Sequence, residues 1–440
     1  MNEPIVTIGI LSDREIHFDL YGDYKNQSNG RHFSGKFKAR LKDNNIALFQ
    51  DSSEIVTAEE FIFVPDDIET ESLLIRNVII GKGFHWQKKE NQRFRGSLKL
   101  IVENDAVTAI NILPLEEYLT SVISSEMNAN SSFELLKSHA IVSRGWLLAQ
   151  MEKIGKSAVS ESVIENEIIR WYNRDDHKNF DFCADDHCQR YQGVTKILNE
   201  NASSAVASTR GLTLTYKNEI CDTRYSKCCG GMTESFENVW EPEVHEYLSS
   251  MVDYKFEPDG AEVDLRNEKS AERWIEGNPH SFCNTSNKKI LSQVLVDFDL
   301  ETKDFFRWKV EYTQQELSEL IKTKSGIDFG QIKDLIPIER GNSARIIKLK
   351  IIGERRTVTI GKELEIRKTL SPSHLYSSAF IVKKENIIDG IPQKFILEGA
   401  GWGHGVGLCQ IGAAVMGEMG YGFDEILTHY FRDAQIKKLY

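Results

Sequence analysis

The sequence predicts a mixed α+β protein, because its strand and helix signals come in blocks rather than in regular alternation. Residues 1–112 carry mostly strand signals, and two helices follow after Pro114. A chain of 440 residues, of which 40% are hydrophobic, is long and apolar enough to fill two or three cores. We therefore expect a folded protein of several units without a doubly wound sheet.

Composition divides the chain into four parts: 1–112, a β-rich unit; 113–254, a helical core with a Cys/His-rich excursion; 255–390, an inserted mixed α/β unit; and 391–440, a glycine-rich segment that completes the core. The strands expected in the first part lie at 5–11, 15–22, 60–66, 77–84 and 95–113. The last of these should be a hairpin that turns at Asn104 and Asp105.

Two helices are expected next. The first begins at Pro114, in the favoured first helical position, and runs through LEEYLTSVISSEM. The second starts at Ser131 and Ser132, with Glu134 as a capping-box partner, and reaches about Gln150.

The polar stretch 155–200 predicts an irregular excursion that needs something other than a core to order it. Later elements are a helix in TQQELSELIKTK, paired strands in ARIIKLKIIG and RTVTIGKELEIRK, and helices in GLCQIGAAVMGEM and FDEILTHYF.

Charge and hydropathy exclude several classes of partner. The net charge of −12 and the lack of long Lys/Arg runs argue against nucleic-acid binding. No stretch approaches the roughly 20 apolar residues that a membrane span needs, and the first twenty residues show no signal-peptide pattern. Nothing in the sequence points to an organic cofactor.

Glu126 is the first candidate for chemistry. It continues an apolar stripe on the first helix, formed by Leu115, Tyr118, Leu119, Val122 and Ile123. Burial and the negative end of the helix dipole would both raise the pKa of such a carboxyl, as a general acid for glycosidic cleavage requires. The alternative is a structural role, with Glu126 capping a helix or paired with Lys137 or Arg144.

A metal site is the second candidate. His177, Cys183, His187 and Cys188 supply two imidazoles and two thiols within twelve residues, a donor set that suits tetrahedral zinc. Four protein ligands would leave no open position, so such an ion would be structural. The alternatives are a Cys183–Cys188 disulfide or two exposed histidines. The remaining five of the seven cysteines could not be assigned.

Several motifs resemble the SpoIID/LytB family. LPLEEYLTSVISSEM followed by ELLKSHAIVSRGW is similar to the family signature, with His139 where glutamine is usual. RYSKCCGGMTESFENVW resembles its Tyr-x-Ser-x-x-Gly-Gly-x-Thr-Glu segment, and GAGWGHGVGLCQIGAAVM is the most specific match. The resemblance covers roughly residues 90–440, and it implies a SpoIID-like mixed fold with a glycan-binding groove.

The resemblance implies a lytic transglycosylase of peptidoglycan that prefers glycan strands without stem peptides. Glu126 would protonate the oxygen between N-acetylmuramic acid and N-acetylglucosamine, and would then take a proton from the muramoyl C6 hydroxyl. The product would be a 1,6-anhydro sugar. The substrate groove would be lined by residues at matching positions: Lys137, Arg144, Tyr225, Thr233, Glu234, His404 and Gln410.

Each of these residues also has a structural alternative, namely helix pairing for Lys137 and Arg144, a turn network for Tyr225, Thr233 and Glu234, and protein hydrogen bonding for His404. A His/Cys cluster occurs in some relatives, which supports zinc without requiring it.

Two other functions remain open from the sequence. A zinc-dependent amidase would need an open metal position with three protein ligands and water. A non-catalytic peptidoglycan-binding amidase enhancer of LytB type would bind glycan and leave it uncut, with a cell-wall amidase as partner. For either of these and for the transglycosylase, the resemblance implies a location in the cell envelope.

Overall fold

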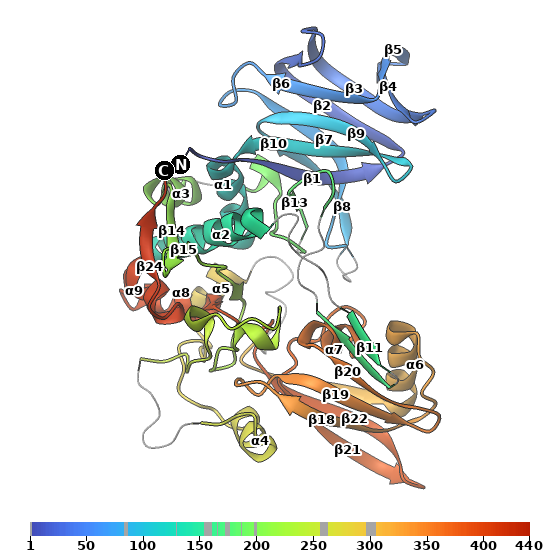
Figure 1. Cartoon of the computed structure of the whole chain (residues 1–440), viewed down its shortest axis with the longest axis vertical. Helices are drawn as coiled ribbons and strands as arrows, with labels where there is room; N and C mark the ends of the chain where they lie inside the picture. The colour runs from blue at the N-terminus through green and yellow to red at the C-terminus, as the bar shows by residue number, and fades with distance from the viewer. Residues whose placement is uncertain are drawn as a thin grey trace. The chain divides into compact units, whose positions relative to one another are not determined.

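The computed structural model (Figure 1) describes residues 2–82, 87–128, 130–153, 161–164, 166–171, 177–185, 187–197, 200–255, 263–295 and 305–440. With 26% helix and 40% strand, the protein is mixed α+β, as predicted. It divides into two compact units: unit 1 comprises Met1–Asn130, Asp176–Leu212 and Lys438–Tyr440, and unit 2 comprises Ser131–Asp175 and Thr213–Lys437. The four predicted parts follow different boundaries and stay a prediction about domains.

Unit 1 is built on a sheet of 11 strands, drawn mainly in blue in Figure 1. Its strands are β1 (Ile5–Asp13), β2 (Glu15–Asn26), β3 (His32–Lys42), β4 (Asn45–Gln50), β5 (Ser53–Ala58), β6 (Glu60–Pro65), β7 (Ser72–Ile80), β8 (Lys88–Phe94), β9 (Ser97–Glu103), β10 (Ala106–Pro114) and β13 (Phe182–Cys183). Alternating apolar residues fill one core, in which Phe18 stacks on Phe37 with ring centroids 5.6 Å apart.

The predicted strands of this unit are confirmed where the structure describes them. The β9–β10 hairpin turns at Asn104 and Asp105, whose φ angles of 48° and 56° are those of a two-residue hairpin loop. Residues 83 and 84, the end of one predicted strand, lie outside the described residues. The sequence analysis missed β3, β4, β5 and β8. In β3 and β8, many charged residues weaken the alternation on which strand prediction depends.

Helix α1 (Leu115–Glu126), the 3₁₀ turn Gly193–Lys196 and helix α3 (Asn201–Ser208) complete unit 1. Pro114 is the N-cap of α1 and the last residue of β10, with ψ at 147°, and not the first helical residue. Its extended ψ lets one proline end the strand and start the helix, so the predicted position was wrong by one residue.

Unit 2 contains a buried helix, α2 (Phe133–Lys153), which contacts α8 (Gln410–Glu418) and α9 (Phe423–Tyr430). Glu134 does not form the predicted capping box. Its carboxylate accepts from Lys137 Nζ at 2.7 Å and from the N–H of Phe423 at 2.8 Å. Ser132 Oγ caps the helix by accepting from the N–H of Leu135.

Two sheets and two helices form a second core in unit 2. One sheet comprises β11 (Glu161–Ile164), β12 (Glu167–Arg170), β20 (Thr357–Gly361), β19 (Ile346–Gly353) and β18 (Ile332–Arg340); the other comprises β17 (Arg307–Thr313), β22 (Ile391–Ala400) and β21 (Phe380–Ile388). Helices α6 (Gln314–Ser325) and α7 (Glu363–Thr369) contribute to this core.

The remaining elements of unit 2 are α4 (Glu268–Glu276), α5 (Lys288–Val294), β14 (Leu212–Tyr216), β15 (Glu219–Ile220), β16 (Tyr225–Ser226), β23 (Leu408–Cys409), β24 (Gln435–Lys438) and the 3₁₀ turns Phe236–Asn238 and Glu246–Leu248.

Two expectations need correction in this unit. Residues 363–368, predicted as the end of a strand, form α7, because Ile366 and Leu370 are buried one helical turn apart. The polar stretch 155–200 is not wholly irregular, since β11 and β12 pair with each other and β12 pairs with β20. Among the described residues, no helix combines the length and the apolarity needed to cross a membrane.

Candidate functional site

Glu126 is the last residue of α1 and ends its buried face. Tyr118, Val122 and Ile123 on this face have no exposed surface, and Glu126 is 8% exposed. The helical periodicity thus places this carboxylate at the edge of an apolar stripe, as the sequence predicts. A partly buried carboxyl at a helix C-terminus is a suitable group for proton transfer.

The backbone that follows the Cys/His cluster contacts Glu126. The N–H of Arg190 donates to Oε1 of Glu126 at 3.1 Å. The next residue, Tyr191, stacks on Tyr118 of α1 with ring centroids 4.9 Å apart, and its hydroxyl donates to Oδ1 of Asn111 at 2.6 Å. Tyr191 therefore fixes the position of the amide that binds Glu126, and an amide donor favours the ionised carboxylate.

Lys137 and Arg144 belong to α2, in unit 2, whereas Glu126 belongs to unit 1. Lys137 Nζ forms an ion pair with Glu134 and lies 4.6 Å from the ring centroid of Phe133. Arg144 is completely buried. The groove role of these two residues beside Glu126 stays a prediction.

Thr233 and Glu234 are buried and hydrogen-bonded within unit 2. The carboxylate of Glu234 accepts five hydrogen bonds, from the N–H groups of Ser235, Asn342 and Ser343, the hydroxyl of Ser343 and the amide of Asn238. Thr233 Oγ1 accepts from the N–H of Met251 at 2.9 Å. This geometry matches the turn network that was the alternative to sugar binding.

Tyr225 and Gln410 both contact His139. The amide Nε2 of Gln410 donates to Nε2 of His139 at 3.0 Å, and the ring of Tyr225 lies 4.5 Å from the His139 ring, centroid to centroid, in an edge-on geometry. Burial lowers the pKa of His139 to about 3, so this imidazole is neutral. The three residues form one buried cluster of unit 2.

His404 lines a small pocket of unit 2 together with Arg170, Val239, Trp240, Lys362, Glu363, Leu364 and Arg367. The Val406 N–H donates to His404 Nδ1 at 3.1 Å, so the neutral ring carries its hydrogen on Nε2. Burial, together with the positive charges of Arg224 and Arg345, holds the pKa of His404 well below its ordinary value.

We call this pocket the His404 pocket. Its lining includes three cationic residues, Arg170, Lys362 and Arg367, and one carboxylate, Glu363. Arg170 also pairs with Glu365 at 3.0 Å and Arg367 with Glu363 at 3.2 Å. Lys362 Nζ lies 3.8 Å from the ring centroid of Trp171, and burial lowers the pKa of Lys362 to about 8. Sequence reasoning missed these residues because they come from separate segments; the aromatic FENVW segment, which contains Trp240, was the only signal.

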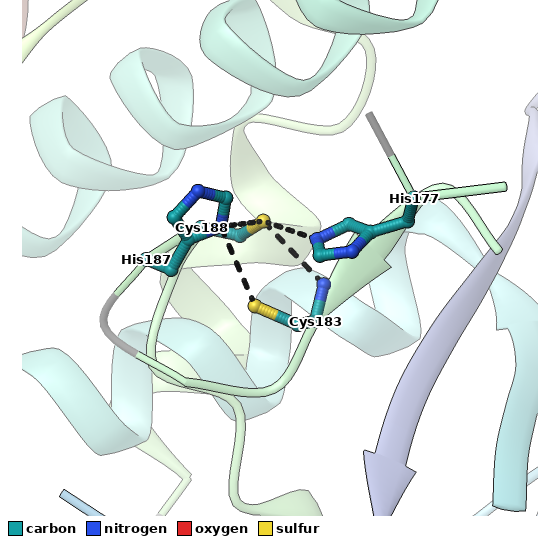
Figure 2. Close-up of side chains that lie close together, drawn as sticks. All are labelled: His177, Cys183, His187 and Cys188. Carbon is teal, nitrogen blue, oxygen red and sulfur yellow. Dashed lines mark hydrogen bonds between the residues drawn. The ribbon is translucent and has the colours of Figure 1, made fainter. Parts of the chain in front are cut away.

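The Cys/His cluster predicted from the sequence does converge. Figure 2 shows the side chains of His177, Cys183, His187 and Cys188 directed toward one another. All four donor atoms lie within 4.8 Å of one another. Cys188 Sγ is 3.5 Å from His177 Nε2 and 3.5 Å from His187 Nδ1, and Cys183 Sγ is 3.7 Å from His187 Nδ1.

These separations match a tetrahedral zinc site. Sulfur and nitrogen ligands at their usual distances from zinc, about 2.3 and 2.1 Å, would lie about 3.6 Å apart. The N–H of Cys183 donates to Cys188 Sγ at 3.4 Å, which would help to stabilise a thiolate there. Hydrogen bonds with Cys188, His177 and His187 lower the pKa of Cys183, against the opposing effect of burial. No disulfide joins any of the seven cysteines, all of which lie in the described residues.

The segment that carries this cluster is attached to the edge of the unit 1 sheet. β13 pairs in parallel with β1, and Asp181 accepts from the N–H and the hydroxyl of Thr7 at 2.9 and 2.7 Å. Only Gln189 lies between Cys188 and Arg190, whose N–H binds Glu126. The cluster therefore sits where an ion would order the backbone that contacts Glu126.

Comparisons with known proteins agree with the motifs. The family model described as Stage II sporulation protein (SpoIID) matches residues 103–216, and one described as Domain of unknown function (DUF8618) matches residues 234–407. An uncharacterized protein of Brachyspira hyodysenteriae is 25% identical over 343 residues, which cover 78% of this chain and 72% of that protein.

Two Bacillus proteins are also similar. Stage II sporulation protein D of Bacillus amyloliquefaciens is 25% identical over 332 residues, 75% of this chain and 76% of that protein. The amidase enhancer of Bacillus subtilis is 22% identical over 324 residues, which cover 71% of this chain and 39% of that longer protein. The signature motifs, the family match around Glu126 and this similarity over three quarters of the chain all support the SpoIID family.

Proposed function

We propose that this protein acts on bacterial peptidoglycan as a lytic transglycosylase, with Glu126 as both acid and base. The observation that carries the proposal is the position of Glu126: it ends the buried face of α1, at 8% exposure, inside the segment that matches the SpoIID family. The expected substrate is a glycan strand from which amidases have removed the stem peptides, and the expected location is the outer side of the cytoplasmic membrane.

The reaction needs one group that gives and then accepts a proton. Protonated Glu126 would transfer its proton to the glycosidic oxygen as the bond from C1 of N-acetylmuramic acid breaks. The resulting carboxylate would take the proton of the C6 hydroxyl as O6 bonds to C1. The Arg190 N–H, 3.1 Å from Oε1, would stabilise the carboxylate between these steps.

We propose that the Cys/His cluster holds a structural zinc ion. Two neutral imidazoles and two thiolates complete a tetrahedral set, so no position remains for a catalytic water. This argues against the zinc-dependent amidase, which needs an open site. The ion would hold the segment that leads from Cys188 to Arg190.

An amidase enhancer is the second candidate function, favoured by the similarity to the Bacillus subtilis protein of that name. A protein of this kind would bind glycan, leave it uncut and act through a cell-wall amidase. The two candidates share a substrate and differ in whether the glycosidic bond breaks.

Incubation of the full chain with amidase-treated peptidoglycan tests the proposal. Mass spectrometry of released sugars should show anhydro-muramoyl products, lighter by one water than hydrolysed ones, with the wild type and not with Glu126→Gln. Glu117→Gln is the matched control, because it makes the same change on the same helix at a residue that pairs with Arg95. If the glycan stays intact and co-sediments with the wild type, the lytic transglycosylase proposal would be wrong and the amidase enhancer would be favoured.

A further inference from the structure

A second group of metal-type ligands lies inside unit 2, remote in sequence from the Cys/His cluster. The Sγ atoms of Cys229, Cys283 and Cys409 and a carboxylate oxygen of Asp253 all lie within 4.8 Å of one another. Cys229 Sγ is 3.5 Å from Cys283 Sγ and 3.4 Å from Asp253 Oδ2. All four residues are buried, with 2% exposure or less.

From these four residues, which we call the Cys3Asp cluster, we infer a second, structural binding site for a divalent zinc ion. The two short separations are close to those expected around tetrahedral zinc, about 3.5 to 3.8 Å between ligand atoms. Thiolates with one carboxylate are a donor set that favours zinc over the harder cations Mg²⁺ and Ca²⁺. The four protein ligands close the coordination sphere, and full burial excludes water from it.

In the part of the chain that the structure describes, no lysine or arginine pairs with the carboxylate of Asp253. It accepts from the Tyr430 hydroxyl at 2.6 Å and from the N–H of Cys283 at 3.0 Å. The only ion-pair geometry involving Asp253 among the described residues is with His429 Nε2, at 3.9 Å, which is too long for a hydrogen bond. A buried carboxylate without a cation is costly, and a bound divalent ion would supply the missing positive charge.

Two arginines that contact the backbone at Cys229 and Gly230 show the opposite imbalance of charge. The guanidinium of Arg345, 1% exposed, donates to the carbonyl oxygens of Cys229 and Gly403 and to the hydroxyl of Ser343. That of Arg307 donates to four carbonyl groups, one of them that of Gly230. In the described residues neither arginine pairs with a carboxylate. Thiolates held by a metal would provide the negative charge that these two cations, one buried and one half-buried, lack.

Hydrogen bonds around the sulfur atoms are those of a thiolate site. The N–H of Cys229 donates to Cys409 Sγ at 3.2 Å, and Ser281 Oγ lies 3.5 Å from Cys283 Sγ. Donors directed at sulfur stabilise its negative charge and orient metal ligands.

The proposed ion would join four segments that are distant in sequence. Cys229 precedes the Gly230-Gly231 turn, Cys409 is the N-cap of α8, and Asp253 and Cys283 lie in two intervening loops. The glycine-rich segment 399–407 runs beside them, since Trp402 forms two backbone hydrogen bonds with Cys228. Zinc at this point would hold the glycine-rich segment in place.

Metal analysis of the purified full chain tests the inference without depending on glycan cleavage. We expect two zinc ions per chain by native mass spectrometry and elemental analysis, and one in the double variant His177→Ala, Cys188→Ser, which removes only the Cys/His site. Cys283→Ser in that background should hold none, whereas Cys221→Ser, a buried cysteine outside the cluster, should keep one.

Three results would overturn the inference. The first is a double variant that folds, as judged by circular dichroism, and contains no zinc. The second is iron in place of zinc. The third is an unreduced wild-type chain lighter by two hydrogens with Cys229 and Cys283 in one cross-linked peptide, which would make the pair a disulfide. If Cys283→Ser does not fold, the zinc content of the double variant and of the wild type still tests the inference.

Discussion

Gln410 and His139 form a buried pair in unit 2, in which the glutamine amide donates to Nε2 of the imidazole at 3.0 Å. The other ring nitrogen, Nδ1, lies 3.3 Å from the hydroxyl of Ser143, so both nitrogens have partners and the neutral ring donates from Nδ1. Glutamine is the usual residue at position 139 in the family motif. The pair therefore replaces an amide with an imidazole that titrates.

This pair predicts a pH-dependent stability. Because the pKa of His139 falls to about 3 in the folded state, the unfolded chain binds more protons between pH 6.5 and 3, and stability is lost as the pH drops through this range. Between pH 7 and 5 the loss from this residue should be about 2 kcal/mol, from about 1.4 kcal/mol per pKa unit. Urea unfolding at pH 7 and pH 5 measures this loss, which should be smaller by that amount in His139→Gln than in the wild type. His17→Gln, at an exposed site, should lose as much stability as the wild type.

Tyr191→Phe should destabilise unit 1. The substitution removes the hydroxyl that donates to Asn111 Oδ1 and leaves a buried acceptor unsatisfied, at a cost of about 1–3 kcal/mol. Chemical denaturation measures the loss. The ring stacking on Tyr118 persists in this variant, so Tyr191→Leu should cost more; equal stability of wild type and Tyr191→Phe would contradict the assigned hydrogen bond.

Glu234 should be a stability residue more than a contact for substrate. Glu234→Ala leaves five donors, three of them buried, without their acceptor. We expect a loss of about 3–5 kcal/mol in unfolding free energy, since hydrogen bonds to charged groups contribute about 1.5–3 kcal/mol each and are not additive. Glu243→Ala, at an exposed position nearby, is the control. A fully stable Glu234→Ala that binds glycan less well would favour the sugar-binding role instead.

Loss of the zinc ion that we propose for the Cys/His cluster should loosen the backbone next to Glu126. His177→Ala removes one ligand, so the chain should lose one zinc ion, and the amide of Arg190 should exchange its hydrogen faster by at least about tenfold, which corresponds to about 1.4 kcal/mol of local opening. Hydrogen-exchange mass spectrometry of peptides covering 187–197 provides the measurement. Unchanged exchange at Arg190 in a variant that has lost this ion would show that the ion does not order the backbone that contacts Glu126.

The His404 pocket should bind an anionic group, and we expect Lys362 to make this binding depend on pH. With its pKa at about 8, Lys362 is charged below that pH and neutral above it, so binding of glycan that bears free lactyl carboxylates should weaken as the pH rises through 8. Co-sedimentation with amidase-treated peptidoglycan tests this. Lys362→Arg should remove the pH dependence, and Lys362→Met should weaken binding below about pH 8 and bind like the wild type above it. Strands that keep their stem peptides are the control.

Local sequence patterns were sufficient to predict several strands of unit 1 and the buried face of α1. Alternation predicted β1, β2, β6, β7, β9 and β10, and helical periodicity placed Glu126 at the end of the buried face of α1. Close spacing in the sequence was sufficient to predict that the four residues of the Cys/His cluster meet. His177 and Cys188 are only eleven residues apart, and a short segment has few ways to fold around one point. Such features depend on neighbours in sequence, which a single sequence displays.

Contacts between residues that are distant in sequence could not be predicted from local patterns. The His404 pocket joins Arg170 to Lys362, and the Cys3Asp cluster joins Cys229 to Cys409, across about 180 residues of chain that carry no spacing signature. The burial of charged residues could not be predicted either. Glu234 and Asp253 are fully buried in the structure, but nothing in the sequence distinguishes them from exposed acidic residues. The sequence by itself determined the fold class, the family and the individual groups that can do chemistry. Only the tertiary structure decided which of these groups meet, because packing of distant segments sets both their distances and their exposure to water.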